Sequence, residues 1–368
     1  MTFRLVLNII ISIFFVLGAI DYLIGDKFKL GTEFSKAFSF IGRVALTIVG
    51  MISLAPVLAD ILTPVVRPVY NFFGLDPAMF ITLVLPPDSG AYDIAMDLAN
   101  DPAIGKWAGT VCAAHLGACI AFNIPTCLGM IDPIHHRHFS LGALSGIIAC
   151  PFGCILGGII CGIPVGAVLF NLIPTILLSV IIAVGLMFKP NGFIKAFQIF
   201  SKLLRVVITI GLVSAAIQRL TGYVVIPGMQ DISVGFLTAG TIGLSMAGIM
   251  CLTKVLSVVL KKPLKSLSGK LGINEVAVLN CFNSLCAALP GAAAYSDMDS
   301  RGKVVFASMA ISSANVLGAH LSFIGMNCPE YLMPTVVSKL FSGVLGVAVA
   351  IMFSKRIMDK IESKPVSE

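Results

Sequence analysis

The chain has 368 residues, of which 57% are apolar and only 12% are charged, and its net charge is +7. A soluble globular domain carries roughly 25% charged residues, so this composition excludes a water-soluble surface. The net positive charge lies in the loops between apolar stretches rather than on one surface, which argues against a nucleic-acid partner and for a lipid bilayer.

Apolar stretches long enough to cross a membrane as helices recur along the chain, since about 20 such residues span the hydrocarbon core. They lie near residues 3–24, 38–63, 103–131, 139–161, 165–187, 204–223, 232–260, 302–325 and 329–353. The first stretch has one flanking cation, Arg4, and no small-residue cleavage site, so we interpret it as a retained helix rather than a signal peptide. The sequence therefore predicts an all-α polytopic membrane protein with about nine full transmembrane helices.

Lysine and arginine gather in alternate loops, a distribution that marks the cytoplasmic side of a membrane protein. These loops lie near residues 30, 135, 195 and 262, and the C-terminal tail, residues 356–368, is also cationic. The segment from Asp88 to Asp101 is acidic and falls on the opposite side. We therefore expect the tail and C-terminus in the cytoplasm and the N-terminus outside.

One uncharged segment, from Pro77 to Pro87, is too short to be a full span. As a helix it would cover only about half of the hydrocarbon core. It ends in Pro86-Pro87-Asp88-Ser89-Gly90, which no regular helix would continue through. We interpret it as one arm of a re-entrant hairpin near residues 77–100.

The chain matches itself at an offset of 197 to 198 residues. Ala19–Gly25 corresponds to Ala216–Gly222, and Gly74-Leu75-Asp76 corresponds to Gly272-Ile273-Asn274. The loop charges give matching spans opposite directions, so we predict two inverted repeats, residues 1–190 and 198–355. These opposite directions require that the segments near residues 77–100 and 274–299 each enter and leave on one face of the membrane. We therefore predict a second re-entrant hairpin near residues 274–299.

Interrupted segments at matching places of inverted repeats indicate a transport site near the bilayer midplane. We therefore expect the two hairpin tips, Pro86–Asp93 and Leu289–Tyr295, to meet there. Irregular backbone at that depth must be buried in protein or line a wet cavity, because unsatisfied polar groups cost several kcal/mol in hydrocarbon.

The first tip supplies the strongest candidates for binding a cation. Asp88 would provide a carboxylate, Ser89 a hydroxyl and Gly90 close access to the backbone, while Tyr92 and Asp93 would add an aromatic face and a second carboxylate. The alternatives are a shallow hairpin with Asp88 in outer water, and an Asp93 that only stabilises a helix N-terminus.

Other polar residues inside apolar stretches could line the same route. His320 and His115 are candidates for hydrogen bonding to a polar substrate, and Asn123 falls on His320 at the repeat offset. Tyr295 joins the site if the tips meet and is otherwise a packing residue. Each histidine could instead be satisfied by a neighbouring group.

Three charged residues are candidates for the pathway or for gating. Lys339 lies near the middle of the last apolar stretch and could pair with a pathway carboxylate, although its stem could also snorkel to the membrane surface. Asp299 and Arg301 belong to a charged group after the second hairpin, which we interpret first as an ion-pair cluster at the hairpin base.

The sequence offers little support for an enzyme, a metal site or a cofactor. The ten cysteines are scattered, without a CxxC pair or zinc-ligand spacing, and a phosphate loop or a nucleophile placed against a base is absent from the sequence. Gly142, Gly146, Gly153 and Gly157 form a small-residue face typical of close helix packing. We therefore expect no enzymatic activity, no metal and no cofactor.

The chain resembles the ethanolamine permease family of ethanolamine utilisation systems over nearly its full length. The matching stretches are Ala55–Leu58, Asp88–Gly90, Phe122–Pro125, Phe197–Phe200, Met298–Lys303 and His320-Leu321. Two departures concern the substrate more than the fold: the second tip, Cys286–Pro290, is less polar than in the family, and Ala319 stands where an acid often precedes the histidine.

The resemblance implies a multi-pass permease in the inner membrane of a bacterium that admits ethanolamine, a small cationic amino alcohol, above all at low external pH. The alternatives are a transporter of another small polar or cationic solute and a membrane component without transport. Whether uptake is passive or coupled to H⁺ or Na⁺, and whether the chain forms a homo-oligomer, is left open by the sequence.

Overall fold

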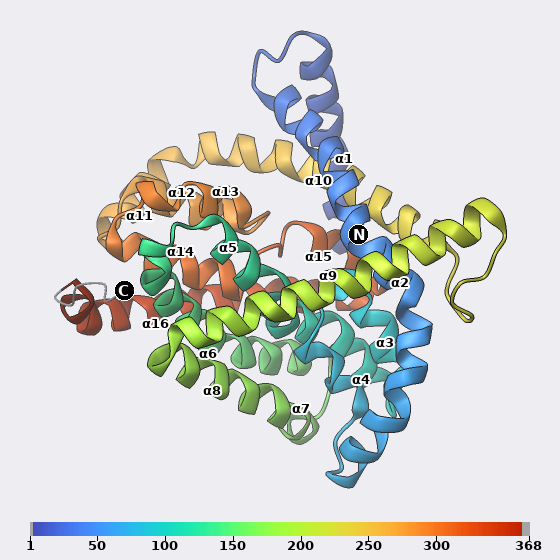
Figure 1. Cartoon of the computed structure of the whole chain (residues 1–368). Coiled ribbons are helices and arrows are strands. Elements are labelled where there is room, and N and C mark those ends of the chain that lie inside the picture. The colour runs from blue at the N-terminus through green and yellow to red at the C-terminus, as the bar shows by residue number, and fades with distance from the viewer. Residues whose placement is uncertain (1–2, 363–368) are drawn as a thin grey trace.

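The computed structural model describes residues 3–362, and every regular element in that range is a helix (Figure 1). Seven helices of this range are long and apolar enough to cross a membrane: Phe3–Leu23, Leu30–Phe72, Pro102–Met130, Pro133–Ile160, Lys195–Thr221, Ile232–Val259 and Pro329–Ser354. A pair bent by 46°, α7 (Val165–Asn171) and α8 (Ile173–Phe188), raises the number to eight if it forms one span. The described chain is thus an all-helical, multi-pass membrane protein, as its composition predicts.

The eighth predicted span, near residues 302–325, is interrupted. Helix α14 (Ser300–Ser312) ends before residues 313–318, and α15 (Ala319–Asn327) begins after them. The freed backbone is satisfied by the second hairpin, because the N–H of Asn315 donates to the Ser284 carbonyl and that of Leu317 to the Leu285 carbonyl. Hydropathy alone could not reveal this break, since its partners lie about 30 residues away in the sequence.

Four long helices form one packed group: α1 (Phe3–Leu23), α2 (Leu30–Phe72), α9 (Pro190–Thr221) and α10 (Ile232–Val259). Helix α2 packs on α9 and α10, and α1 packs on α10; Figure 1 shows α9 crossing the front of the molecule. Gly50 of α2 faces the Ile208 carbonyl of α9, and Gly248 of α10 faces the Ile11 carbonyl of α1. Glycine permits this close approach of backbones, and the two glycines are related by the repeat offset.

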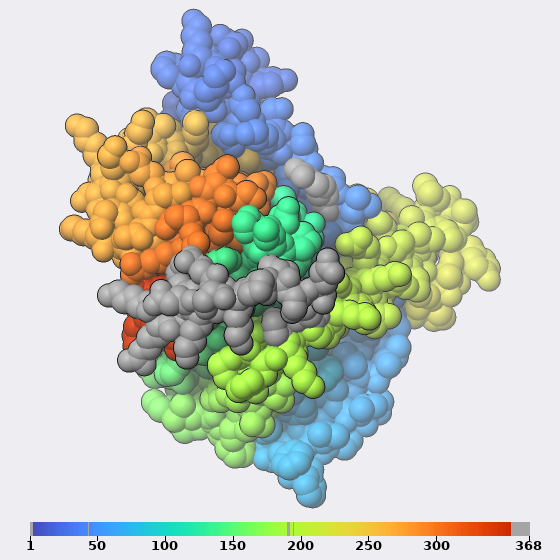
Figure 2. Space-filling model, turned by 60° about the vertical axis from the view of Figure 1, so that its left-hand side comes forward, coloured from blue at the N-terminus to red at the C-terminus, as the bar shows by residue number. Residues whose placement is uncertain are grey.

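Two turns within this group project from the rest of the protein. Figure 2 shows the α1–α2 turn in blue and the α9–α10 turn in yellow-green, each extending beyond the body of the molecule. They follow Leu23 and Leu220, the matching leucines of the predicted repeats, which are both highly exposed. Matching segments therefore have matching surroundings.

The second packed group contains α6 (His136–Ile160), α14 and α16 (Leu332–Glu362). The glycine face of α6 lies between its two neighbours. Gly142 contacts Val304 of α14, and Gly157 contacts Ser338 of α16. These glycines serve close packing, as predicted. Helix α16 continues into the predicted tail as far as Glu362, and residues 363–368 lie outside the described range.

The first short apolar segment is a series of turns. It contains η1 (Pro77–Met79), η2 (Ile81–Leu83) and η3 (Pro87–Ser89), followed by α3 (Ala91–Leu98). Pro86 and Pro87 lack an N–H and so prevent a continuous helix, and Gly90 reverses the chain with a φ of 85°. The second segment contains α12 (Glu275–Ser284), α13 (Leu289–Ala293) and η7 (Tyr295–Asp297).

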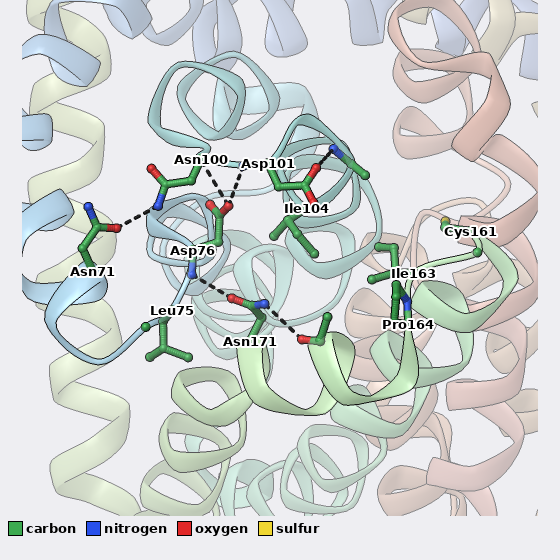
Figure 3. Close-up of a pocket in the computed structure, with 14 residues that line it drawn as sticks. Asn71, Leu75, Asp76, Asn100, Asp101, Ile104, Cys161, Ile163, Pro164 and Asn171 are labelled. Atoms are coloured by element: carbon green, nitrogen blue, oxygen red, sulfur yellow. Dashed lines mark hydrogen bonds between the residues drawn. The ribbon is translucent and has the colours of Figure 1, made fainter.

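Asp76 secures the base of the first segment. Its carboxylate accepts hydrogen bonds from the N–H groups of Ala78, Asn100 and Asp101 at 2.9–3.1 Å, and its own N–H donates to Asn171 Oδ1 at 2.7 Å. Figure 3 shows this network at the edge of a cavity of about 570 Å³. The buried carboxylate thus ties both ends of the segment together.

Asn274, which matches Asp76 in the repeat, secures the second segment in the same manner. Its Oδ1 accepts from the Ala277 N–H, its own N–H donates to Asp299 Oδ1 at 2.8 Å, and its Nδ2 donates to the Asp297 carbonyl. Each segment therefore begins with a side chain that binds the end of that segment.

Candidate functional site

Asp88 lies in the η3 turn, which packs against α2 and α15. Its side chain is half-buried. Asp88 interacts electrostatically with Lys339 of α16, although these two described residues do not form an ion pair within 4 Å. The tip carboxylate and the membrane-embedded lysine of the sequence prediction thus share one polar region.

Lys339 is completely buried, with 0% of its surface exposed, so its side chain does not snorkel to a membrane surface. Its Nζ donates to the Ala114 carbonyl at 2.5 Å and lies 3.4 Å from His320 Nδ1. An ammonium has only donors, so Nδ1 of His320 accepts and the neutral ring carries its proton on Nε2. His320 is therefore oriented with an N–H donor directed away from Lys339.

His115 lies in the π-helical stretch η4 (Ala108–Gly117) and is held at both ring nitrogens. Its Nδ1 lies 2.7 Å from the Val111 carbonyl, and its Nε2 lies 3.1 Å from Ser342 Oγ. A carbonyl can only accept, so Nδ1 carries a proton. Ser342, which sequence reasoning missed, lies 3.2 Å from the Ala149 carbonyl and links His115 to α6.

Asn123 ends the second π-helical stretch, η5 (Cys119–Asn123), and is 1% exposed. Its Oδ1 accepts from Asn315 Nδ2 at 3.4 Å. Its own Nδ2 is buried without a hydrogen-bond partner. Nearly all buried polar groups in proteins are paired, so this donor is available for a group that enters the site.

The remaining residues of the first tip surround Asp88. Gly90 packs on Met51 and Ala55 of α2, Ser89 is half-buried, and the Tyr92 ring meets Phe323 of α15 at a centroid distance of 6.2 Å. Asp93 is half-buried in the first turn of α3, where a carboxylate also stabilises the helix dipole. Both interpretations of Asp93 fit this position.

Three candidates belong to a different region, at the base of the second segment. Tyr295 is buried, its hydroxyl donates to the Lys303 carbonyl at 3.0 Å, and its ring packs on Phe139 and Phe306. Asp299 binds Asn274, and Arg301 approaches Gly272. Tyr295 has the contacts of a packing residue at the hairpin base. Asp299 and Arg301 also lie at this base, but neither forms an ion pair within 4 Å in the described part of the chain, so the predicted ion-pair cluster does not appear.

A second cavity, of about 540 Å³, lies beside the second tip. Its wall includes Cys286 and Pro290 of the tip, Met250 of α10, and the charged residues Glu33 and Lys254. Glu33 lies in the first turn of α2 and Lys254 near the end of α10, so both are next to loops that the charge distribution predicts to be cytoplasmic. The cavity of Figure 3 is lined by residues of the acidic side, among them Asp101.

Within residues 3–362, no group of three or more His, Cys, Asp or Glu side chains is placed to hold a metal ion. Asp88, His320 and Asn123 offer a carboxylate, an imidazole donor and an amide donor, in that order. These are the kinds of groups that bind an ammonium and a hydroxyl.

The comparisons with known proteins agree on one family. The profile of the family described as Ethanolamine utilisation protein, EutH, matches residues 4–353. A protein of Listeria monocytogenes named probable ethanolamine permease EutH is 44% identical over 96% of this chain and 94% of its own length. The Escherichia coli protein of the same name is 35% identical over 88% of this chain and 85% of its own length.

An uncharacterized Bacillus subtilis protein, YxeR, is 37% identical over 93% of this chain and 92% of its own length. No solved structure matches. The family match covers both hairpin segments and all the candidate residues. The chain belongs to the ethanolamine utilisation protein EutH family.

Proposed function

We propose that this protein is a membrane permease for ethanolamine, which it binds as the ammonium ion. The observation that carries the proposal is the half-buried Asp88 at an irregular tip that packs against α2 and against α15, the helix that carries the buried His320. Three relatives that are 35–44% identical are named probable ethanolamine permeases. The carboxylate of Asp88 neutralises the charge of the substrate ammonium, and His320 Nε2 or Asn123 Nδ2 donates a hydrogen bond to the substrate hydroxyl.

Two inverted repeats with re-entrant hairpins are part of the proposal. The reciprocal packing of α1 on α10 and α2 on α9 supports them, as do the matched positions of Gly50 with Gly248 and of Asp76 with Asn274. In such an arrangement the hairpins enter and leave on the same face and line the route at membrane depth. Nine crossings of the membrane, one of them by the interrupted segment near residues 302–325, and tips that meet at the midplane stay predictions.

The orientation follows from the loop charges. We assign the N-terminus to the outside, the C-terminus to the cytoplasm, and the protein to the inner membrane of a bacterium. The cavity beside Cys286 then opens toward the cytoplasm. The permease matters most at low external pH, because protonated ethanolamine does not leak through lipid while the neutral amine does.

Uptake of labelled ethanolamine into proteoliposomes at pH near 6 tests the function. An attraction worth about 4 kcal/mol at ~4 Å and an effective dielectric of ~20 is partly offset by desolvation. We expect Asp88→Asn to weaken apparent affinity by roughly ten- to hundredfold. Asp97→Asn, an exposed carboxylate of the same segment, is the matched control and should retain wild-type uptake.

The same assay separates the alternatives. Competition by ethylamine and by larger cations that exceeds competition by ethanolamine would favour another cationic solute. Uptake equal to that of protein-free liposomes would contradict a transport function altogether. Wild-type affinity in Asp88→Asn would remove this carboxylate from the site and leave Asp93 as the next candidate.

A further inference from the structure

Lys339 places a second positive charge in the site that the proposed function assigns to a cationic substrate. Its ammonium is fully buried, donates to the Ala114 carbonyl and lies beside His320. The titratable groups that interact with it from the neighbouring elements are Asp88 in η3, His320 in α15, Cys119 in η5, and Cys150 and Cys154 in α6. Asp88 is the one carboxylate among them.

The charge balance of the site depends on whether substrate is bound. Without substrate, Asp88 and Lys339 carry one negative and one positive charge. An added ethanolammonium would leave one uncompensated positive charge beside the fully buried Lys339, which is strongly unfavourable. Neutrality returns if the buried lysine gives up its proton, and lysine is the side chain that does so most readily when it is desolvated.

We propose that ethanolammonium binding displaces the proton of Lys339, so that the permease exchanges one ethanolammonium for one proton and moves no net charge. This inference rests on the proposed function and deepens it by assigning a coupling ion. Lys339 acts as the resident cation of the empty site. When substrate binds, its ammonium takes the attraction of Asp88, and the amine of Lys339 still donates an N–H to the Ala114 carbonyl.

The cycle balances in protons and charge. Outside, ethanolammonium binds and the Lys339 proton leaves to external water, so the loaded site holds Asp88⁻, ethanolammonium and neutral Lys339. Inside, ethanolammonium leaves and Lys339 takes a proton from the cytoplasm, so the empty site returns with Asp88⁻ and Lys339⁺. Both the loaded and the empty sites are neutral, and one proton moves outward for each ethanolammonium that moves inward.

The test measures voltage dependence in proteoliposomes at equal internal and external pH. A potassium gradient with valinomycin sets the potential to about −100 mV inside. A carrier that moves one net charge would accumulate ethanolamine about fiftyfold at this potential, since 100 mV acts on one charge with about 2.3 kcal/mol. We expect wild-type accumulation to be unchanged by the potential, and fiftyfold accumulation would overturn the proposal.

Two substitutions assign the effect to Lys339. Lys339→Gln keeps a donor for the Ala114 carbonyl but has no proton to release, so its uptake should become voltage-driven and approach the fiftyfold limit. Lys339→Arg keeps a charge that is not released, so its uptake should fall more than tenfold. Lys303→Met removes the other buried lysine of the described chain, in α14, and should leave uptake insensitive to voltage.

Calorimetry in two buffers of different ionisation enthalpy provides a readout that does not need transport. Wild type should release about one proton per ethanolamine bound at pH near 6, and Lys339→Gln should release none. Voltage-insensitive uptake by Lys339→Gln, or wild-type binding without proton release, would remove Lys339 from the coupling. Absence of wild-type uptake and binding would instead contradict the proposed function itself.

Discussion

The side chains of Asn123 and Asn315 meet, with Asn315 Nδ2 3.4 Å from Asn123 Oδ1. Asn123 ends a π-helical stretch of one half of the chain, and Asn315 lies in the interruption between α14 and α15 of the other half, with a φ of 63°. The contact joins two irregular segments, and it leaves Asn123 Nδ2 without a partner. A substrate group that accepts a hydrogen bond from this Nδ2 would complete the network.

Substitution of Asn123 tests whether this donor recognises the substrate hydroxyl. Asn123→Leu conserves volume and removes the donor, so ethanolamine affinity should fall by roughly five- to hundredfold, which corresponds to one lost buried hydrogen bond of ~1–3 kcal/mol. Ethylamine lacks the hydroxyl and should lose much less affinity. The measurement is the inhibition of labelled uptake by each amine.

A matched control for Asn123 is Asn280, a buried asparagine whose Nδ2 is already bonded to the Val276 carbonyl of its own helix. Asn280→Leu should not discriminate between the two amines. Equal losses for ethanolamine and ethylamine in Asn123→Leu would assign Asn123 to packing.

Gly153 of α6 creates the space in which His115 reaches Ser342. A Cβ at this position would collide with Ser342 Oγ and lie 2.5 Å from His115 Nε2. We therefore expect Gly153→Ala to break that hydrogen bond and lower the free energy of unfolding by about 1–3 kcal/mol, as overpacking of a filled interior does. Thermal unfolding in detergent measures the change.

Gly240 of α10 provides the comparison, because a Cβ there would meet no heavy atom within 4 Å. Gly240→Ala should leave the midpoint of unfolding unchanged or raise it, since alanine favours a helix over glycine by up to about 1 kcal/mol. Identical midpoints for the two variants would show that α6 and α16 can separate without cost.

The sequence predicted the broad fold and the residues of the first tip, but not the contacts that connect them. Apolar length and loop charge depend on neighbours along the chain, and they identified a helical membrane protein and singled out Asp88, His320 and Lys339. The Lys339–Ala114 hydrogen bond joins residues 225 positions apart, so no local pattern could indicate it. The interruption at residues 313–318 was missed for the same reason, because the second hairpin satisfies its N–H groups.

One missed feature carried a signal that could have been used. Ser338 and Ser342 flank Lys339 at helical spacing and lie opposite the glycines of α6, a pattern of small polar and small apolar faces that indicates a buried polar seam. For Tyr295, in contrast, the sequence pattern did not indicate the contact that the structure shows. Its place in the second tip, Leu289–Tyr295, suggested a role in the site if the tips meet, yet its hydroxyl is bonded within the hairpin base.

Asp76 is expected to be a stability determinant rather than a substrate ligand. Its carboxylate accepts three backbone N–H groups, which Asp76→Ala would leave unsatisfied (Figure 3). Because hydrogen bonds to charged groups contribute ~1.5–3 kcal/mol each, the free energy of unfolding should fall by at least about 2 kcal/mol. Thermal unfolding of the variant beside Asp97→Ala checks this, and equal midpoints would contradict the assignment.

The two cavities predict opposite accessibility for two cysteines. Cys286 lies at the wall of the cavity beside the second tip, and Cys161 lies at the wall of the cavity in Figure 3. The loop charges place the cavity lined by Cys286 on the cytoplasmic side and the cavity lined by Cys161 on the outer side. A membrane-impermeant thiol reagent should therefore modify Cys286 in inside-out vesicles and Cys161 in right-side-out vesicles, as mass spectrometry of the digested protein can establish.

Cys286→Ser and Cys161→Ser identify each signal, and the fully buried Cys112 and Cys154 serve as internal controls that should stay unmodified from both sides. Because Cys286 belongs to the proposed second tip, saturating ethanolamine should slow its modification, whereas Cys161 lines the other cavity and should react at the same rate. Modification of Cys286 from the outer side would overturn the orientation, and with it the inverted relation of the two halves.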